Sequence, residues 1–231
     1  MGRQGFVRGI IFDFDGVLID TEPIYLRIIN EVLQKAGVLP MTREAYQDLI
    51  GTPAGNTWDT FHALYELPRS ASYYQRLYDD RLEGVLQREL TLRPEADVLL
   101  REVAERGLPR GLATSSRRSW LEFKLRVLEL EGYFCSVVSA EDVGHAKPAP
   151  HVYLRAAAEA GVPTEAALAI EDSPSGIAAA KAAGIYTIAL RTTSTEGMDL
   201  SIADEVVDSL NEINLDVLLE SAASEGALQC R

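Results

Sequence analysis

Short apolar runs of strand length recur along the chain and alternate with helical patterns, and this alternation limits the possible folds more than any other feature. Helical patterns follow Arg118 and cover 152–160 and 176–183, between the later runs. The predicted strands are Phe6–Phe12, Arg110–Ala113, Phe134–Ser139, Ala166–Ile170, Tyr186–Leu190 and Glu205–Val207. Strands that alternate with helices predict an α/β fold, in which a Rossmann-like parallel sheet carries helices on both faces.

Residues 22–88 interrupt this alternation with a purely helical block. Helices are predicted from Thr21, whose side chain can cap the first one, and over 42–50, 57–65 and 70–88. We therefore predict an all-helical cap at 22–88, inserted into an α/β core formed by residues 1–21 and 89–231, with 221–231 as a loose tail. The junctions near 19–22 and 90–94 would be hinges, because inserted caps act as lids that exclude water.

Reactive side chains follow three of the predicted strands. Asp13 and Asp15 follow the first, Thr114 follows the second, and Glu171 and Asp172 follow the fourth. We expect them to converge, since ligands of open α/β sheets bind at the carboxyl ends of the strands. Carboxylates at the end of a buried strand are costly unless a cation or a reaction uses them. The pattern predicts a divalent cation beside a carboxylate that attacks phosphorus.

A lysine next to two prolines adds a candidate cationic group. Pro148 restricts Lys147 to extended conformations, and Pro150 suits the first turn of the following helix. The ammonium group is thus presented on a stiff segment. Without the three strand-end motifs, a solvated loop lysine would be the better interpretation.

Charge and composition exclude several classes of partner. The net charge is -13 and the pI about 4.7, which disfavours nucleic acid and anionic membranes because both are bound mainly through Lys and Arg. No apolar stretch is long enough to cross a bilayer, and the N-terminus lacks the apolar core of a secretory signal. Cys135 and Cys230 lie far apart and are expected to be free thiols, as in a reducing cytosol. We expect a cytoplasmic monomer.

Four motifs together carry a resemblance to a known family. They are DFDGVLIDT at 13–21, ATSS at 113–116, AKPAP at 146–150 and EDSPSG at 171–176. The chain resembles the haloacid dehalogenase-like superfamily, in the branch with a helical cap after the first strand, close to β-phosphoglucomutase and small sugar-phosphate phosphatases. The resemblance covers nearly the whole chain. It implies a Mg²⁺-dependent phosphomonoester hydrolase (phosphatase) acting on a small phosphorylated metabolite, such as a sugar or polyol phosphate.

The resemblance also implies a role for the matched carboxylates. Asp13 would be the nucleophile that forms an aspartyl-phosphate. Asp15 would first protonate the leaving oxygen and then act as the base that activates the incoming group. The Asp13 carboxylate, the Asp15 backbone carbonyl and Asp172 would hold Mg²⁺, with Glu171 bound directly or through water.

The remaining matched residues would bind the substrate. Thr114, the Ser115 backbone amide and Lys147 would hold the phosphoryl oxygens. Further candidate substrate contacts are Ser116, Arg117, Arg118 and Asn56. Two arginines at the start of a helix oppose its dipole unless an anion binds there, although two solvated arginines are an equal alternative. Asn56 belongs to the cap loop 51–58, which the family places over the active site, and the neighbouring Trp58 is expected in the cap core.

Two other functions remain as alternatives. β-Phosphoglucomutase has a histidine where Tyr25 stands, and a lysine and an arginine where Ile50 and Ala54 stand. Losing these donors removes contacts to a second phosphate, so we favour a phosphatase over a phosphohexose mutase. A receiver-like phosphoryl switch is a third interpretation, against which the helical insert and Asp15 argue. A dehalogenase is not expected, because that branch has no carboxylate at the position of Asp15.

Overall fold

A six-stranded parallel sheet forms the centre of the core in the computed structural model, which describes residues 7–47 and 57–219. The strands lie in the order β3–β2–β1–β4–β5–β6, and each neighbouring pair is parallel. This confirms the predicted α/β class. The strands are β1 (Gly9–Phe12), β2 (Arg110–Thr114), β3 (Ser136–Ser139), β4 (Ala167–Glu171), β5 (Tyr186–Leu190) and β6 (Glu205–Val207).

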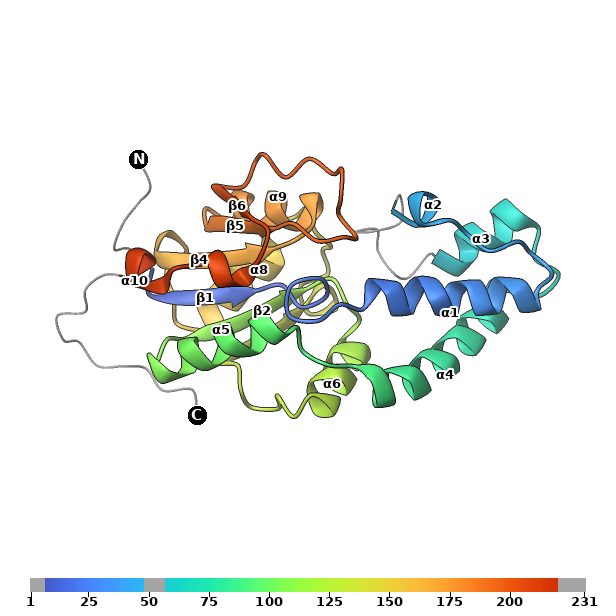
Figure 1. Ribbon diagram of the computed structural model, residues 1–231, viewed down its shortest axis with the longest axis horizontal. Coiled ribbons are helices and arrows are strands. Elements are labelled where there is room, and N and C mark those ends of the chain that lie inside the picture. The colour runs from blue at the N-terminus through green and yellow to red at the C-terminus, as the bar shows by residue number, and fades with distance from the viewer. Residues whose placement is uncertain (1–6, 48–56, 220–231) are drawn as a thin grey trace.

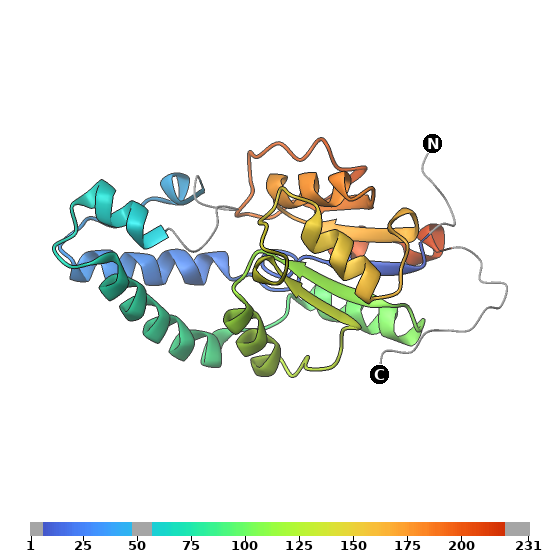
Figure 2. The same cartoon turned by 180° about the vertical axis from the view of Figure 1, so that it is seen from behind.

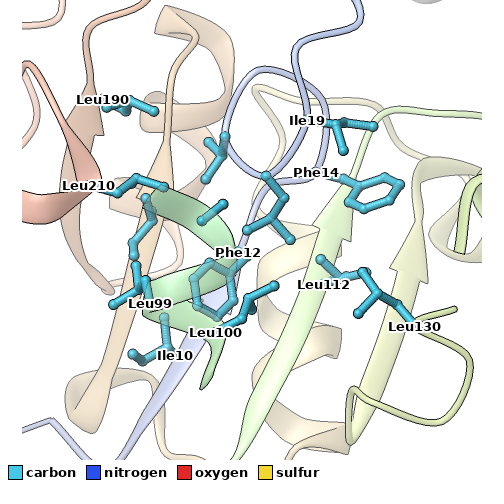
Figure 3. Close-up of a cluster of buried hydrophobic side chains, with 14 of the residues drawn as sticks. Ile10, Phe12, Phe14, Ile19, Leu99, Leu100, Leu112, Leu130, Leu190 and Leu210 are labelled. Atoms are coloured by element: carbon cyan, nitrogen blue, oxygen red, sulfur yellow. The ribbon is translucent and has the colours of Figure 1, made fainter. Parts of the chain in front are cut away.

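Helices pack on both faces of the sheet because successive side chains of a strand point to opposite faces. Ile10 and Phe12 of β1 belong to one apolar cluster together with Leu99 and Leu100 of α5 (Pro94–Glu105) (Figure 3). Ile11, between them, belongs to a second cluster with residues of α8 (His151–Glu159) and α9 (Pro174–Ala182). Each fully buried side chain of this size contributes about 1.5–3 kcal/mol. The ends of the strands are therefore held by packing from both sides.

Shorter elements complete the core. The helix α6 (Arg118–Val127) follows β2 and contributes Leu121 and Leu125 to the first cluster. The others are α7 (Ala140–Val143), the 3-10 helices η2 (Thr164–Ala166) and η3 (Leu210–Glu212), and α10 (Leu215–Leu218).

Four helices lie at one end of the molecule, past the carboxyl end of β1 (Figures 1 and 2). They are α1 (Glu22–Lys35), α2 (Arg43–Gln47), α3 (Thr57–Tyr65) and α4 (Ala71–Glu89). Val32, Leu33, Trp58 and Phe61 are among the buried residues of an apolar cluster that these helices share. A core of their own supports the proposal of a separate cap at 22–88, and the exact boundaries stay a prediction.

The two chain segments that join the cap to the core lie side by side. Ile19 and Leu92 form an antiparallel bridge. The Arg93 N–H donates to the carbonyl of Leu18 at 2.9 Å, and its side-chain Nε donates to the carbonyl of Gly16 at 3.0 Å. Arg93 therefore ties the second junction to the loop that follows β1.

The expectation of a free thiol at Cys135 is wrong in the structure. Cys135 is disulfide-bonded, so it is not the free thiol that we expected, because distance along the chain does not fix distance in space. The argument for a reducing compartment loses its basis.

Within the part of the chain that the structure describes, no helix has both the length and the apolar character needed to span a membrane. The expectations for Cys230, Asn56, Ile50, Ala54 and the tail 221–231 concern residues outside the described ranges.

Candidate active site

The carboxyl ends of β4, β1 and β2 meet at one edge of the sheet, since these strands are neighbours. The N–H of Asp13, directly after β1, donates to the carbonyl of Ile170 in β4 at 2.9 Å. Thr114 and Glu171 are the last residues of β2 and β4. The edge opens into a cavity of about 210 Å³. Core residues on its wall are Asp13, Asp15, Thr114, Ser115, Ser116, Arg117, Trp120, Lys147, Asp172, Ser173 and Ser175.

Lys147 is buried in this cavity wall between two carboxylates. Its Nζ lies 2.5 Å from Asp13 Oδ1 and 2.5 Å from Glu171 Oε1, and its side chain is 3% exposed. Tyr153 lies beneath it: its OH donates to Glu171 Oε1 at 2.8 Å, and its ring centre is 5.0 Å from the ammonium nitrogen. Burial lowers the pKa of Lys147, but the two carboxylates raise it by more, so the net pKa is above its usual value. Lys147 is therefore a permanent cation beside Asp13.

Three buried carboxylates form an acidic cluster around this single lysine. One oxygen from each of Asp13, Glu171 and Asp172 lies within 4.8 Å of the others. Burial and the neighbouring carboxylates raise the pKa of Asp13 to about 8, although Lys147 opposes the shift. Burial, then Asp13 and Glu171, raise the pKa of Asp172 well above its usual value. Three potential negative charges against one positive charge leave a deficit that a divalent cation would remove. The all-oxygen donor set suits Mg²⁺.

The three carboxylates differ in how many hydrogen bonds they already accept. Glu171 Oε1 accepts from Lys147 and Tyr153, and Oε2 accepts from the backbone N–H groups of Asp172 and Ser173 at 3.0 and 3.2 Å. The Asp172 side chain accepts none from the described part of the chain. We therefore expect Asp13 and Asp172 to be the direct carboxylate ligands of a cation, with Glu171 orienting Lys147.

Two glycines make room for these carboxylates. Gly16 has φ +93°, and a Cβ there would lie 2.0 Å from Asp172 Oδ2. Gly176 lies in the first turn of α9, and a Cβ there would lie 1.9 Å from Glu171 Oε1. Any side chain at either position would collide with the acidic cluster.

Asp15 lies on the same loop but has a different set of partners. Its Oδ1 accepts from Thr21 Oγ1 at 2.7 Å and from the Tyr25 OH at 2.9 Å, and its Oδ2 accepts from Ser116 Oγ at 2.7 Å. Lys124 Nζ contacts both oxygens, at 2.6 and 2.7 Å. Burial alone would raise the pKa of Asp15, but the charge and hydrogen bond of Lys124, with the hydroxyl donors, bring it below its usual value.

Lys124 is the main residue of this site that the sequence reasoning missed. It was overlooked because it belongs to none of the four motifs. The available signal was its position three residues after Leu121 and one before Leu125, two apolar residues of the helical pattern that follows Arg118. Lysine at such a position is rarely buried without a partner.

Thr21 has another role than the expected one. The structure places it at the N-cap of α1, but its side chain makes no capping hydrogen bond. The hydroxyl instead donates to Asp15. The prediction of a side-chain cap is wrong: Thr21 has helical backbone angles (φ -92°, ψ -18°) in place of the extended ones that suit a capping side chain, and its hydroxyl is turned to Asp15.

Comparisons with known proteins agree with this geometry. A family model described as haloacid dehalogenase-like hydrolase matches residues 10–190. The chain belongs to this family. Hexitol phosphatase B of Escherichia coli (strain K12) is 33% identical over 92% of this chain and 97% of its own length. The phosphorylated carbohydrates phosphatase of Thermotoga maritima is 33% identical over 79% of this chain and 84% of its own.

A solved structure shares both the core and the cap arrangement. CbbY from Rhodobacter sphaeroides, crystallised in complex with phosphate, aligns with a TM-score of 0.78. The two proteins are 29% identical, and the alignment covers 89% of this chain and 96% of CbbY. The resemblance inferred from the motifs is thereby confirmed.

The motif residues of this haloacid dehalogenase-like hydrolase converge as expected, whereas the two arginines diverge. Arg117 lines the cavity, and its guanidinium lies 2.9 Å from Asp79 of the cap helix α4. Arg118 begins α6 and does not line the cavity. Its guanidinium donates to the carbonyl of Val137 at 2.8 Å and pairs with Glu122 at 2.8 Å.

The cap supplies the opposite wall of the cavity. Its lining residues are Glu22, Tyr25, Ile29, Tyr46, Thr57, Trp58, Gln75, Tyr78 and Leu82. Glu22 accepts a hydrogen bond from the Tyr46 hydroxyl, and burial raises the pKa of Glu22 to about 7. Trp58 is buried, as predicted for the cap core, and also lines the cavity. Sequence reasoning missed Glu22, which looked like an ordinary acidic residue in a first helical turn.

Proposed function

We propose that this phosphatase hydrolyses phosphate monoesters of sugars or polyols with Mg²⁺ as cofactor and Asp13 as nucleophile. One observation carries the proposal: Asp13 lies beside Lys147 and Asp172 at the base of a cavity whose opposite wall is the cap. A carboxylate, a cation and a metal-type donor set at one point are the groups that phosphoryl transfer requires.

The reaction then proceeds in two steps. Asp13 attacks phosphorus, the bond to the leaving oxygen breaks, and Asp15 gives its proton to that oxygen. In the second step a water oxygen attacks the aspartyl-phosphate, Asp15 takes a proton from that water, and the Asp13–phosphorus bond breaks. When bound, Mg²⁺ would neutralise part of the negative charge on the phosphoryl oxygens. Asp13 and Asp172 would hold it, together with the backbone carbonyl of Asp15.

Three groups of the core would hold the phosphoryl oxygens. Thr114 is buried at the end of β2, and its Oγ1 accepts from the Ser116 N–H at 3.1 Å, so its own hydroxyl proton can turn to a ligand. The Ser115 amide and the Lys147 ammonium complete the set. Orientation and charge neutralisation of this kind account for most of the catalysis of phosphoryl transfer.

A monophosphate fits the cavity better than a bisphosphate. Among the lining residues in the described ranges, the only cations are Lys147 and Arg117, and Arg117 is already paired with Asp79. Tyr25, at the position where the mutase has histidine, donates to Asp15. These contacts support a phosphatase over a phosphohexose mutase. A cap that covers the reacting groups has no use in a receiver-like switch.

The lining of the cavity supports a hydroxylated substrate body. Glu22, Thr57 and Gln75 offer donors and acceptors, while Trp58 and Trp120 offer flat apolar surface. Two relatives are named for hexitol and for phosphorylated carbohydrates, which agrees with such a body. We further propose that the protein has neither nucleic-acid nor membrane partners, since its net charge of -13 repels polyanions.

A substrate screen tests the proposal. Release of inorganic phosphate is measured with a panel of hexitol, sugar and glycolytic monophosphates in Mg²⁺, with Asp13→Asn as the blank. We expect turnover of at least one sugar or polyol monophosphate, loss of turnover in EDTA, and a phosphoryl adduct on Asp13 in rapidly quenched enzyme. An isomerised product that depends on a bisphosphate primer, or an adduct on another residue, would contradict the proposal.

A further inference from the structure

Lys124 is fully buried although it is a lysine in the middle of a helix. Its side chain is 1% exposed, and its Nζ lies 2.6 Å from Asp15 Oδ1, 2.7 Å from Oδ2 and 3.0 Å from Ser116 Oγ. The ring centres of Phe14 and Tyr25 lie 5.5 and 5.7 Å from the nitrogen. Asp15 is the only carboxylate that pairs with this ammonium group among the described residues.

Lys124 reaches Asp15 from behind. Asp15, Ser116 and Tyr25 line the cavity, but Lys124 does not. A substrate in the cavity can therefore touch the Asp15 carboxyl group without touching the lysine. Any effect of Lys124 on the reaction must act through Asp15.

The partners of Asp15 come from both parts of the molecule. Thr21, at the junction with the cap, and Tyr25, in the cap helix α1, donate to Oδ1, whereas Ser116 belongs to the core and donates to Oδ2. Lys124, from the core helix α6, is the only partner in the described residues that binds both oxygens. It bridges the two oxygens, whereas each of the other donors binds a single one.

Stability alone is a weak reason for this arrangement. A buried ion pair contributes little over apolar residues of similar volume, because both charges lose their hydration. The face of α6 around Lys124 is otherwise apolar, with Leu121 and Leu125 in the core cluster. A leucine or methionine would fill such a position without that desolvation cost.

We propose that Lys124 is a positioning residue for proton transfer, which holds the Asp15 carboxyl group at the cavity wall in the orientation that meets the leaving oxygen. This inference rests on the proposed function, because it takes Asp15 as the proton donor. In the first step Asp15 is protonated on one oxygen and keeps only one of its two Lys124 contacts: the protonated oxygen gives its proton to the leaving oxygen, and the other keeps the Lys124 hydrogen bond. In the second step the same oxygen takes the proton of the attacking water.

Leaving groups with different proton needs test this role. We compare kcat/KM, which reports the first step, for the best alkyl phosphate of the screen and for p-nitrophenyl phosphate, whose leaving group departs without a proton. In Lys124→Met we expect kcat/KM to fall about 100-fold or more with the alkyl phosphate but less than about 10-fold with the aryl phosphate. Lys124→Arg, which keeps the charge and the donors, should recover much of the alkyl activity.

Control variants separate the possible failures. Lys181→Met replaces a lysine of α9 that pairs with Asp204 outside the cavity. It should change the activity with neither substrate. Lys124→Gln replaces Lys124→Met if the latter does not fold. Equal losses with both leaving groups, unchanged activity, or failure of both neutral variants to fold would overturn the positioning role. Absence of phosphatase activity in the wild type would instead refute the proposed function.

Discussion

Replacing Lys147 by methionine should destabilise the protein by about 3–5 kcal/mol in the absence of divalent cations. The side chain is 3% exposed and pairs with both Asp13 and Glu171 at 2.5 Å. Methionine fills most of the same volume, so the loss is that of charge and hydrogen bonds. The variant leaves the buried acidic cluster with no cation.

The upper limit of this effect follows from protonation. A buried carboxylate that loses its partner can take up a proton instead of remaining charged. At pH 7.5, protonating a carboxyl group with a usual pKa near 4 costs about 5 kcal/mol. The lower limit is the cost measured when one partner of a buried ion pair is removed, about 3 kcal/mol.

Urea unfolding in EDTA at pH 7.5 measures this difference. Lys181→Met is the matched control, because Lys181 pairs with Asp204 at 2.6 Å with side chains 34% and 28% exposed, and such a pair is worth at most about 1 kcal/mol. Saturating Mg²⁺ should recover part of the loss in Lys147→Met, since a cation that binds only the folded state stabilises it. A loss no larger than that of the control would refute the electrostatic account of the acidic cluster.

Three further changes test separate parts of the site. Gly16→Ala should lower stability by more than the roughly 1 kcal/mol that a positive φ costs a residue with a Cβ, and it should abolish activity. The reason is that its Cβ would lie 2.0 Å from Asp172 Oδ2. Thermal unfolding measures the stability, and phosphate release measures the activity. Glu22→Gln should leave stability unchanged near pH 4.5 and raise it progressively up to pH 7. The pKa of Glu22 is 4.5 in the unfolded wild type and about 7 in the folded protein, so wild-type stability falls as the pH rises between these values. The fall is at most about 3 kcal/mol, and about half of that for a side chain that faces the cavity. Urea unfolding at pH 5 and pH 8 measures the stability difference between Glu22→Gln and the wild type. An equal difference at both pH values would contradict the raised pKa of Glu22. Tyr153→Phe removes a hydrogen bond to Glu171 and should cost about 1–3 kcal/mol in thermal or urea unfolding, with KM for phosphate esters rising as Lys147 loses its fixed orientation.

Strand positions and strand-end residues could be predicted because each depends on local sequence. β5 and β6 have the predicted bounds, and Asp13, Thr114 and Asp172 stand where three strands end. The apolar runs fix the strands, and the rule that ligands bind at their carboxyl ends fixes the site. The cap residues of the cavity wall were harder to predict: Glu22 lines the cavity because the start of α1 lies beside the loop that follows β1.

Contacts between elements were beyond the sequence. The Thr21 side chain was expected to cap its own helix, but its hydroxyl donates to Asp15. Cys135 was expected to be a free thiol, but it is disulfide-bonded. In each case local chemistry allowed several partners, and the fold decided among them. Lys124 is the same case, because a lysine on an apolar helix face has no partner until α6 packs beside the loop after β1.

The two aspartates of the DFD motif show that a motif alone does not determine the pKa values of its side chains. Asp13 and Asp15 are two residues apart on one loop and both are largely enclosed, yet the pKa of Asp13 is raised to about 8 while that of Asp15 is lowered. Burial acts in the same direction on both, so it cannot explain the difference. Asp13 shares one lysine with other buried carboxylates, whereas Asp15 has Lys124 to itself together with three hydroxyl donors. The difference therefore depends on α6, a helix that lies about a hundred residues further along the chain. A protein with the same loop but an apolar residue at this point of α6 would match the motif equally well and would hold its second aspartate in a different state.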